Sequence, residues 1–293
     1  MNVCMLILVA AAVMGLACMT AWAAEPAPSE KSAPEKAASE KAAEKGAPDN
    51  KAAEKSAAEK GAAEKAPADK NAAVEKTSHG DLTIQPINHS ALRFAFKGKQ
   101  YYVDPAGEAD WDKMPKADVI LITHEHGDHL SAKVINQIRK DGPSPAEGTQ
   151  IFANASTVKK AGVGQTIEIG RKKQVLDITV EAVPAYNLTA DRLNYHPKDR
   201  KDNGYVLAFG DTRVYVAGDT EATPEMKDLR DIAIAFLPIN LPYTMTPKEA
   251  AEAAKVFKPK ILYPYHQGKS DPAEVKKLLA DEKSIEVRVL ALP

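Results

Sequence analysis

The sequence predicts a layered α/β protein that contains mixed β-sheets. From His79 onwards, short apolar runs alternate with turn-forming residues, whereas the first quarter of the 293-residue chain has a different composition. Strand-turn-strand patterns come first in this later part, and strand-like segments then alternate with helix-like ones. Residues 79–293 therefore form the expected domain, and about 215 residues suffice for a single sizeable core.

Residues 1–24 are expected to be a signal peptide or a membrane anchor. The chain is apolar from Val3 to Ala24, and the small residues of Ala21-Trp22-Ala23 precede the first charge, Glu25, as at a secretory cleavage site. The run is also close to membrane-spanning length, and lipid attachment at Cys18 is a third alternative. We therefore expect an exported protein that is periplasmic or associated with the cell envelope, with the N-terminus as a candidate membrane tether.

Residues 25–78 have the composition of a low-complexity spacer rich in Ala, Lys, Glu and Pro. The tetrapeptide AAEK occurs four times, interrupted by prolines. Alanine, glutamate and lysine favour helix, whereas proline breaks it, so a partly helical and solvated segment is expected. The segment lacks the large apolar residues that a core requires.

Composition also limits the chemistry of the folded part. Cys4 and Cys18 both lie in the first 24 residues, so no cysteine is available in the domain as a metal ligand or a nucleophile. The formal net charge of −1 gives no long-range field that would attract nucleic acid. We expect a small-molecule substrate and no nucleic acid, and the sequence leaves the oligomeric state open.

The domain is expected to begin with three strands, at residues 82–87, 91–96 and 101–104. Lys97-Gly98-Lys99 has the composition of a tight connection between the second and the third. The continuous apolar run from Asp118 to Thr123 predicts a strand that is buried on both faces. A helix is expected at residues 131–140, where apolar residues have helical spacing.

Strands and helices alternate in the rest of the domain. The Thr246-Pro247 pair, followed by Glu249, is typical of a helix start. The expected strands lie at residues 150–153, 179–184, 205–209, 213–217, 232–236, 260–263 and 285–290, and the expected helices at residues 224–229, 246–257 and 272–279.

The segment from Thr123 to Leu130 reads THEHGDHL and predicts a metal site. His124 and His126 are two positions apart, so on an extended chain both can face one ion. Gly127 is expected to allow a turn, after which the adjacent Asp128 and His129 diverge. This arrangement suits two neighbouring metals better than one. Asp128 is also the candidate catalytic residue, because a carboxylate can bind a metal and orient a water molecule.

The same segment resembles the HxHxDH signature of the metallo-β-lactamase superfamily. VYVAGDT (residues 214–220) and LYPYH (residues 262–266) resemble the later motifs that deliver an aspartate and a last histidine, in the same order. The resemblance implies an αββα sandwich with metals at the sheet edge between its halves. It also implies that His124 and His126 bind a first metal, that Asp128, His129 and His266 bind a second, and that Asp219 bridges them.

The metal site departs from the family pattern at one position. The first metal normally has a third histidine after a proline-containing strand, and none stands near Tyr186-Asn187. Asn187 could ligate through its amide oxygen, or His196 could enter from the following loop as a ligand or substrate contact. A third alternative is a weak first site, in which case the protein works with one tightly held metal.

Two further residues are expected to support the centre. Asp104, at a strand end, resembles a position that accepts a hydrogen bond from a ligand histidine. His89 lies at a strand junction, where either a pocket role or a structural role is expected.

These observations predict a metal-dependent hydrolase. The resemblance implies a metal-bound hydroxide as the nucleophile, with zinc as the expected metal and manganese or iron as alternatives. A nearer likeness rests on VPAYN (residues 183–187), YHPK (195–198), GYVLAFGDTRVYVAGDTE (204–221) and LPINLPYTMTPKEAAE (237–252). These segments resemble the branch that contains the L-ascorbate phosphate lactonase and the N-acyl phosphatidylethanolamine phospholipase D, which suggests an ester, lactone or phosphodiester substrate. The alternatives are an iron-containing redox enzyme of the same fold and a non-catalytic metal-binding envelope protein.

Overall fold

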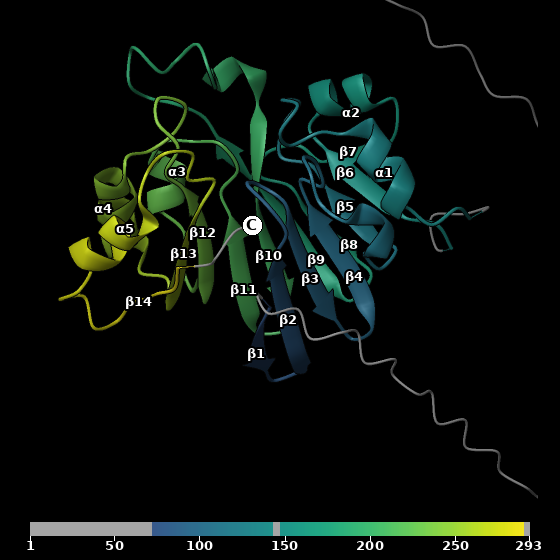
Figure 1. Cartoon of the computed structure of the whole chain (residues 1–293), viewed down its shortest axis with the longest axis horizontal. Helices are drawn as coiled ribbons and strands as arrows, with labels where there is room; N and C mark the ends of the chain where they lie inside the picture. Colours follow the sequence, from purple (N-terminus) through teal and green to yellow (C-terminus); the bar gives the residue numbers. More distant parts are fainter. Residues whose placement is uncertain (1–71, 143–146, 290–293) are drawn as a thin grey trace, which may run out of the picture. The chain divides into compact units, whose positions relative to one another are not determined.

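The computed structural model describes residues 72–142 and 147–289, which belong to one compact unit (Figure 1). The expected signal or anchor segment, residues 1–24, and nearly all of the expected spacer lie outside these residues. Strand β1 (Ala73–Thr77) is the exception, because it pairs antiparallel with β2 (Gly80–Pro86). The expected spacer boundary at residue 78 was therefore wrong, because the Lys and Glu of β1 resemble the spacer in composition.

The first sheet contains strands β1 to β7 in sequence order. Strands β1 to β4 are antiparallel neighbours, and β4 to β7 are parallel. Lys97 and Gly98 connect β3 to β4 with φ angles of 48° and 74°, as a two-residue hairpin turn requires. After β1 and β2, the strands are β3 (Leu92–Phe96), β4 (Lys99–Val103), β5 (Val119–Leu121), β6 (Gln150–Ala153) and β7 (Gln165–Thr166).

The second sheet contains strands β8 to β14 and repeats this pattern. Strands β8 to β11 are antiparallel neighbours, and β11 to β14 are parallel. The strands are β8 (Lys172–Val175), β9 (Ile178–Ala185), β10 (Asp202–Phe209), β11 (Thr212–Val216), β12 (Ile234–Pro238), β13 (Ile261–Tyr265) and β14 (Glu286–Val287).

The sheets pack face to face, and helices cover their outer faces (Figure 1). Alternation along β11 shows the layering, because Val214 and Val216 enter the core between the sheets, whereas Tyr215 packs with the helix-covered side. Helices α1 (Ala132–Ile138) and α2 (Ala155–Ala161) accompany the first sheet, and α3 (Pro224–Lys227), α4 (Pro247–Phe257) and α5 (Pro272–Leu278) the second. The expected layered α/β sandwich is confirmed.

The expected elements are present with shifted ends, but besides β1 three more were not expected. Strand β8 is mostly exposed and polar, β7 has two residues, and α2 buries only Thr157, so none carries a clear hydrophobic period. Short helical turns also occur at Trp111–Lys113 and Lys198–Arg200. Across the two described ranges, no helix has the length and hydrophobicity to cross a membrane.

Parallel strands from both sheets end at one shared edge. The THEHGDHL segment follows β5, Asp219 follows β11 and His266 follows β13. Two hydrogen bonds join the sheets there, from Asn203 N to Thr123 O at 3.0 Å and from Tyr205 Oη to Ile122 O at 2.8 Å. The fold therefore brings together motifs that lie far apart in the sequence.

Candidate metal centre

Asp104 orients two of the histidines at this edge. It is fully buried after β4, and its carboxylate accepts hydrogen bonds from the Thr123 backbone N–H and hydroxyl, each at 2.7 Å. Its Oδ2 also lies 2.8 Å from His129 Nδ1. Because the Thr123 hydroxyl gives its proton to Asp104, it must accept from His124 Nδ1, 3.0 Å away. In their neutral forms both histidines then present the lone pair of Nε2.

One ligand group, the aspartate–histidine group, consists of Asp128, His129 and His266. The Nε2 atoms of His129 and His266 are 3.1 Å apart, and Asp128 Oδ2 lies 3.3 Å from His266 Nε2 and 3.7 Å from His129 Nε2. Asp219 Oδ1 lies 3.4 Å from each of the two histidine nitrogens. Four ligands at zinc distance in tetrahedral geometry would be about 3.3–3.4 Å apart, so these atoms fit one ion.

The other ligand group, the three-histidine group, consists of His124, His126 and His196. Their ligand nitrogens lie within 4.8 Å of one another. Asp219 Oδ2 lies 3.3 Å from His196 Nε2 and 4.0 Å from His124 Nε2. One oxygen of Asp219 therefore faces each group, as a bridging carboxylate would.

The hydrogen bonding of these groups favours a cation. His124 Nε2 and Asp219 Oδ1 are buried and have no hydrogen-bond partner within the described ranges. A buried lone pair that accepts no hydrogen bond costs free energy. A cation bound between these atoms would remove that cost, because it would accept their lone pairs. Imidazole nitrogens with carboxylate oxygens are a donor set that suits a transition-metal ion.

Burial keeps His124 and His126 ready to ligate, whereas at His196 the carboxylates of Asp202 and Asp219 overcome burial and raise the pKa. The pKa of His124 lies well below its usual value because the ring is fully buried and His129 is close. Burial also lowers the pKa of His126, and the neighbouring Arg200 adds to this effect. Both rings are therefore neutral near pH 7, which metal binding requires.

The aspartate–histidine group has the opposite electrostatics. Burial alone would lower the pKa of His129, but the carboxylates of Asp219 and Asp104 raise it well above its usual value. Burial would likewise raise the pKa of Asp219, but His266 and His129 hold it well below the usual range. The carboxylates thus favour positive charge at this position, and a bound metal ion would supply it.

His89 joins the aspartate–histidine group from the end of β2. Its ring centroid lies 3.8 Å from that of His266, and its Nε2 lies 4.0 Å from Asp128 Oδ2. A ligand atom of His89 is also within 4.8 Å of those of Asp128 and His266. His89 therefore faces the aspartate–histidine group. It lies beside Asp128, whose side chain is 49% exposed.

Asn187 holds the loop that carries His196. Its backbone N–H donates to His196 O at 2.8 Å, and its side-chain amide donates to the carbonyls of Arg192 and Tyr243 at 2.9 and 2.7 Å. The amide oxygen is buried without a hydrogen-bond partner among the described residues. The structure thus brings His196 into the three-histidine group, and Asn187 supports its loop.

A clamp on the same loop was not expected from the sequence. Glu221 accepts hydrogen bonds from the backbone N–H groups of Leu188 and Thr189, at 2.5 and 2.6 Å. It also pairs with Arg192 at 2.5 Å, and Arg192 contacts Glu249 of α4 at 2.8 Å. Glu221 lies two residues after the candidate ligand Asp219, and this closeness was the only sign in the sequence that Glu221 has a role near the centre.

Arg200 and Asp202 were also missed, although charged residues crowd the sequence after His196. Arg200 Nη1 lies 2.8 Å from His126 Nε2, and Nη2 lies 2.8 Å from His196 Nδ1. The guanidinium is held by the buried Asp202, with Nε at 2.9 and 2.8 Å from its two oxygens. An arginine thus contacts two of the proposed ligands directly.

The turn in the motif does not depend on its glycine. A Cβ on Gly127 would meet no atom within 4 Å, and its φ lies outside the left-handed region. The strain falls instead on Asp104 and His266, which have φ angles of 49° and 46°.

Two loops beside the centre expose apolar side chains. Leu188 and Leu193 are 48% and 41% exposed on the His196 loop, and Leu241 and Tyr243 are each 43% exposed after β12. Tyr195 packs edge-on against Tyr243, with ring centroids 4.8 Å apart. These loops offer apolar surface next to a polar centre, as organic substrates require.

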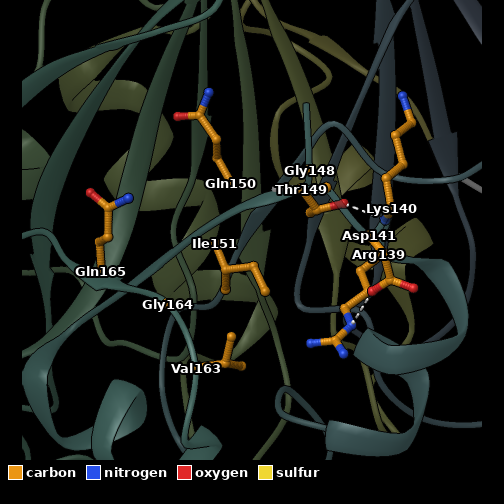
Figure 2. Close-up of a pocket in the computed structure, with 11 residues that line it drawn as sticks. Arg139, Lys140, Asp141, Gly148, Thr149, Gln150, Ile151, Val163, Gly164 and Gln165 are labelled. Atoms are coloured by element: carbon orange, nitrogen blue, oxygen red, sulfur yellow. Dashed lines mark hydrogen bonds and ion pairs between the residues drawn. The ribbon is translucent and has the colours of Figure 1, made fainter. Parts of the chain in front are cut away.

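A separate surface pocket of 390 Å³ lies away from this centre (Figure 2). Figure 2 shows Lys140, Gln150 and Gln165 around it, near the amino ends of parallel strands. Lys140 Nζ pairs with Asp118 at 2.6 Å, just before β5, whereas the histidines follow β5. The pocket is therefore at the opposite edge of the first sheet.

Comparison with known proteins identifies the family. Residues 83–266 match the model of the beta-lactamase superfamily domain. The chain belongs to the metallo-β-lactamase superfamily. A metal-dependent hydrolase of the UPF0173 group from Staphylothermus marinus is 32% identical over 231 residues, which are 71% of this chain and 95% of that protein.

Solved structures of this superfamily agree in fold. A crystal structure from Parabacteroides distasonis, assigned as a metal-dependent hydrolase, is 49% identical, with a TM-score of 0.71 over 76% of this chain and 99% of that one. The metallo hydrolase Igni18 from Ignicoccus hospitalis is 25% identical, with a TM-score of 0.57 over 71% and 94%. The superfamily sandwich therefore spans the described part of the chain.

Proposed function

We propose that the protein is a metal-dependent hydrolase with a two-ion centre at the shared sheet edge. His124, His126 and His196 would hold one ion, and Asp128, His129 and His266 the other. The position of Asp219 carries the proposal, because each of its oxygens faces one group. The names of the relatives support the same activity.

The residues around the centre suit hydrolysis. When bound, the ions would polarise the scissile group and lower the pKa of a water molecule. Asp128 is the exposed acid of the centre, and although burial alone would raise its pKa, the hydrogen bond from His266 and the charge of His129 keep it below the usual range. An ionised Asp128 can accept a hydrogen bond from the attacking water and orient it.

The identity of the metal and the substrate are finer parts of this proposal. Nitrogen and carboxylate ligands with near-tetrahedral spacing support zinc, with manganese or iron as alternatives. An ester, a lactone or a phosphodiester is proposed from the sequence likeness to the lactonase and phospholipase D branch. Export to the periplasm or cell envelope is proposed from the apolar segment of residues 1–24, which lies outside the described residues.

A substrate screen with ligand variants tests the function. Protein loaded with Zn²⁺ or Mn²⁺ is assayed with chromogenic esters, lactones, bis-p-nitrophenyl phosphate and nitrocefin. We expect hydrolysis of an ester, lactone or phosphodiester, with rates reduced more than about 100-fold in His126→Ala and His196→Ala, since even residues that support ligands contribute 10- to 100-fold. His79→Ala, at the β1–β2 turn, is the matched control.

Other outcomes would contradict the proposal. Iron in aerobically purified protein without hydrolysis would favour a redox enzyme. Tight metal binding without turnover of any substrate would favour a non-catalytic metal-binding protein. Full activity in His196→Ala would remove His196 from the centre.

A further inference from the structure

The hydrogen bonds that Arg200 makes to two histidines are incompatible with metal binding by those histidines. The Arg200 side chain is 18% exposed, and it contacts His126 Nε2 and His196 Nδ1, each at 2.8 Å. An arginine can only donate hydrogen bonds, so it requires the lone pair of each ring nitrogen that it contacts.

A neutral imidazole has one nitrogen lone pair available in the ring plane. If His126 binds a metal through either nitrogen, the other nitrogen carries the proton and cannot accept from Arg200. The same holds for His196, whose Nε2 faces Asp219 Oδ2 at 3.3 Å. Its Nδ1 lies 2.8 Å from Arg200 Nη2 and 3.5 Å from Asp202 Oδ2, which can accept the Nδ1 proton when Nε2 binds a metal. Metal loading therefore removes both histidine acceptors from Arg200.

The guanidinium does not become free to leave when these acceptors are lost. Arg200 Nε and Nη2 both contact the carboxylate of Asp202, which is 1% exposed. This two-point contact fixes the plane of the guanidinium, so Nη1 keeps its position beside the centre without a partner. A partly buried, charged donor without an acceptor is costly, and an anionic oxygen would satisfy it.

Arg200 also lines a cavity of 560 Å³. It is of a size that holds small organic molecules. Lys198 and Lys201 line it with Arg200, and Asn154 and Ser156 add polar groups from the start of α2. Two acids, Glu168 and Glu225, also line it. Glu225 already pairs with Lys198 at 3.4 Å and accepts a hydrogen bond from Tyr186 Oη at 2.8 Å.

We propose that Arg200 binds an anionic oxygen group of the substrate, a phosphate or a carboxylate, in the metal-loaded protein. The rest of that molecule would extend into the 560 Å³ cavity. This inference rests on the proposed metal-dependent function and narrows its substrates to anionic ones.

Anion binding, measured without turnover, tests the proposal. Inorganic phosphate and acetate are titrated calorimetrically into the full-length protein, both loaded with metal and after chelation, and the stronger anion identifies the group. In the loaded protein, Arg200→Gln should weaken the preferred anion at least about tenfold, the size expected for one charge-assisted hydrogen bond. Lys255→Gln, which removes one exposed positive charge from α4, should leave the affinity unchanged.

The metal content of the Arg200 variants shows whether Arg200 binds the anion or only supports the metal centre. Since Arg200 competes for ligand lone pairs, Arg200→Gln should bind metal at least as well as the wild type. In Arg200→Gln alone, the Asp202 carboxylate loses its arginine partner. The double variant, Arg200→Gln with Asp202→Asn, removes this unpaired charge and should show the same loss of anion binding.

Three results would overturn the proposal. The first is that the metal-loaded wild type binds no anion. The second is that the two Arg200 variants bind the anion with the same affinity as the wild type, and the third is that both variants lose the metal. Absence of hydrolysis alongside Arg200-dependent anion binding would contradict the proposed function and leave the anion site standing.

Discussion

At the scale of single residues, Asp104 explains how buried histidines acquire defined roles. Its contact with His129 Nδ1, and its contact with His124 through Thr123, fix which nitrogen each ring presents. The two rings then differ in electrostatics, because carboxylates surround His129 and burial dominates at His124. A fixed Nε2 lone pair lowers the cost of ordering the ligand when an ion binds.

His89 gives a pH-dependent prediction. Burial and the charge of His266 lower its pKa from 6.5 to about 4 in the folded protein. The folded state therefore binds fewer protons than the unfolded state in this range, so the contribution of His89 is present above pH 6.5 and lost as the pH falls towards 4. In chelator-treated protein, His89→Asn should show a shallower loss of unfolding free energy between pH 6.5 and 4 than the wild type. Parallel stability curves in urea titrations across this window would contradict the assignment.

At the scale of elements, the loop of residues 187–196 decides whether the first ion has three histidines. The loop has no regular secondary structure, and its position depends on Asn187 at its start and on Glu221 and Arg192 across its middle. Arg192 also ties it to Glu249, which closes the capping box of α4 with Thr246. His196 is thus supported by a helix that contributes no ligand.

Glu221→Gln tests this support. The amide nitrogen of glutamine cannot accept the hydrogen bonds that Glu221 now accepts, so buried donors are left unpaired and the free energy of unfolding should fall by about 1–3 kcal/mol. Hydrogen exchange of the Leu188 and Thr189 amides should accelerate, and metal affinity of the three-histidine group should fall while the other group is kept. Glu252→Gln on α4 is the control, because its pair with Lys248 is exposed and should contribute under about 1 kcal/mol. Unchanged exchange at Leu188 and Thr189 would contradict the clamp.

At the scale of the whole molecule, the centre lies between two halves of similar strand order. The first half, β1 to β7, supplies His124, His126, Asp128 and His129, and the second, β8 to β14, supplies His196, Asp219 and His266. Neither half holds a complete ligand set, so packing of the two sheets is a condition for metal binding.

This division explains what could be predicted from the sequence. Local patterns identified β5 from its apolar run and α4 from its cap, because burial and capping leave signals within a few residues. The motif likeness also identified the residues that lie together at the edge. Strand β8 could not be predicted, because it is mostly exposed and polar. The contacts of Arg200 with His126 and of Glu221 with Thr189 could not be predicted either, because each joins residues that are distant in sequence and meet only through tertiary packing.

Anomalous diffraction from crystals of the zinc-loaded protein would locate the bound ions. We expect two peaks at the zinc absorption edge, with Asp219 in contact with both. One should lie at bonding distance from His124, His126 and His196, and the other from Asp128, His129 and His266. A single peak, or a first-site ion without His196 among its ligands, would contradict the two-ion centre proposed for this fold.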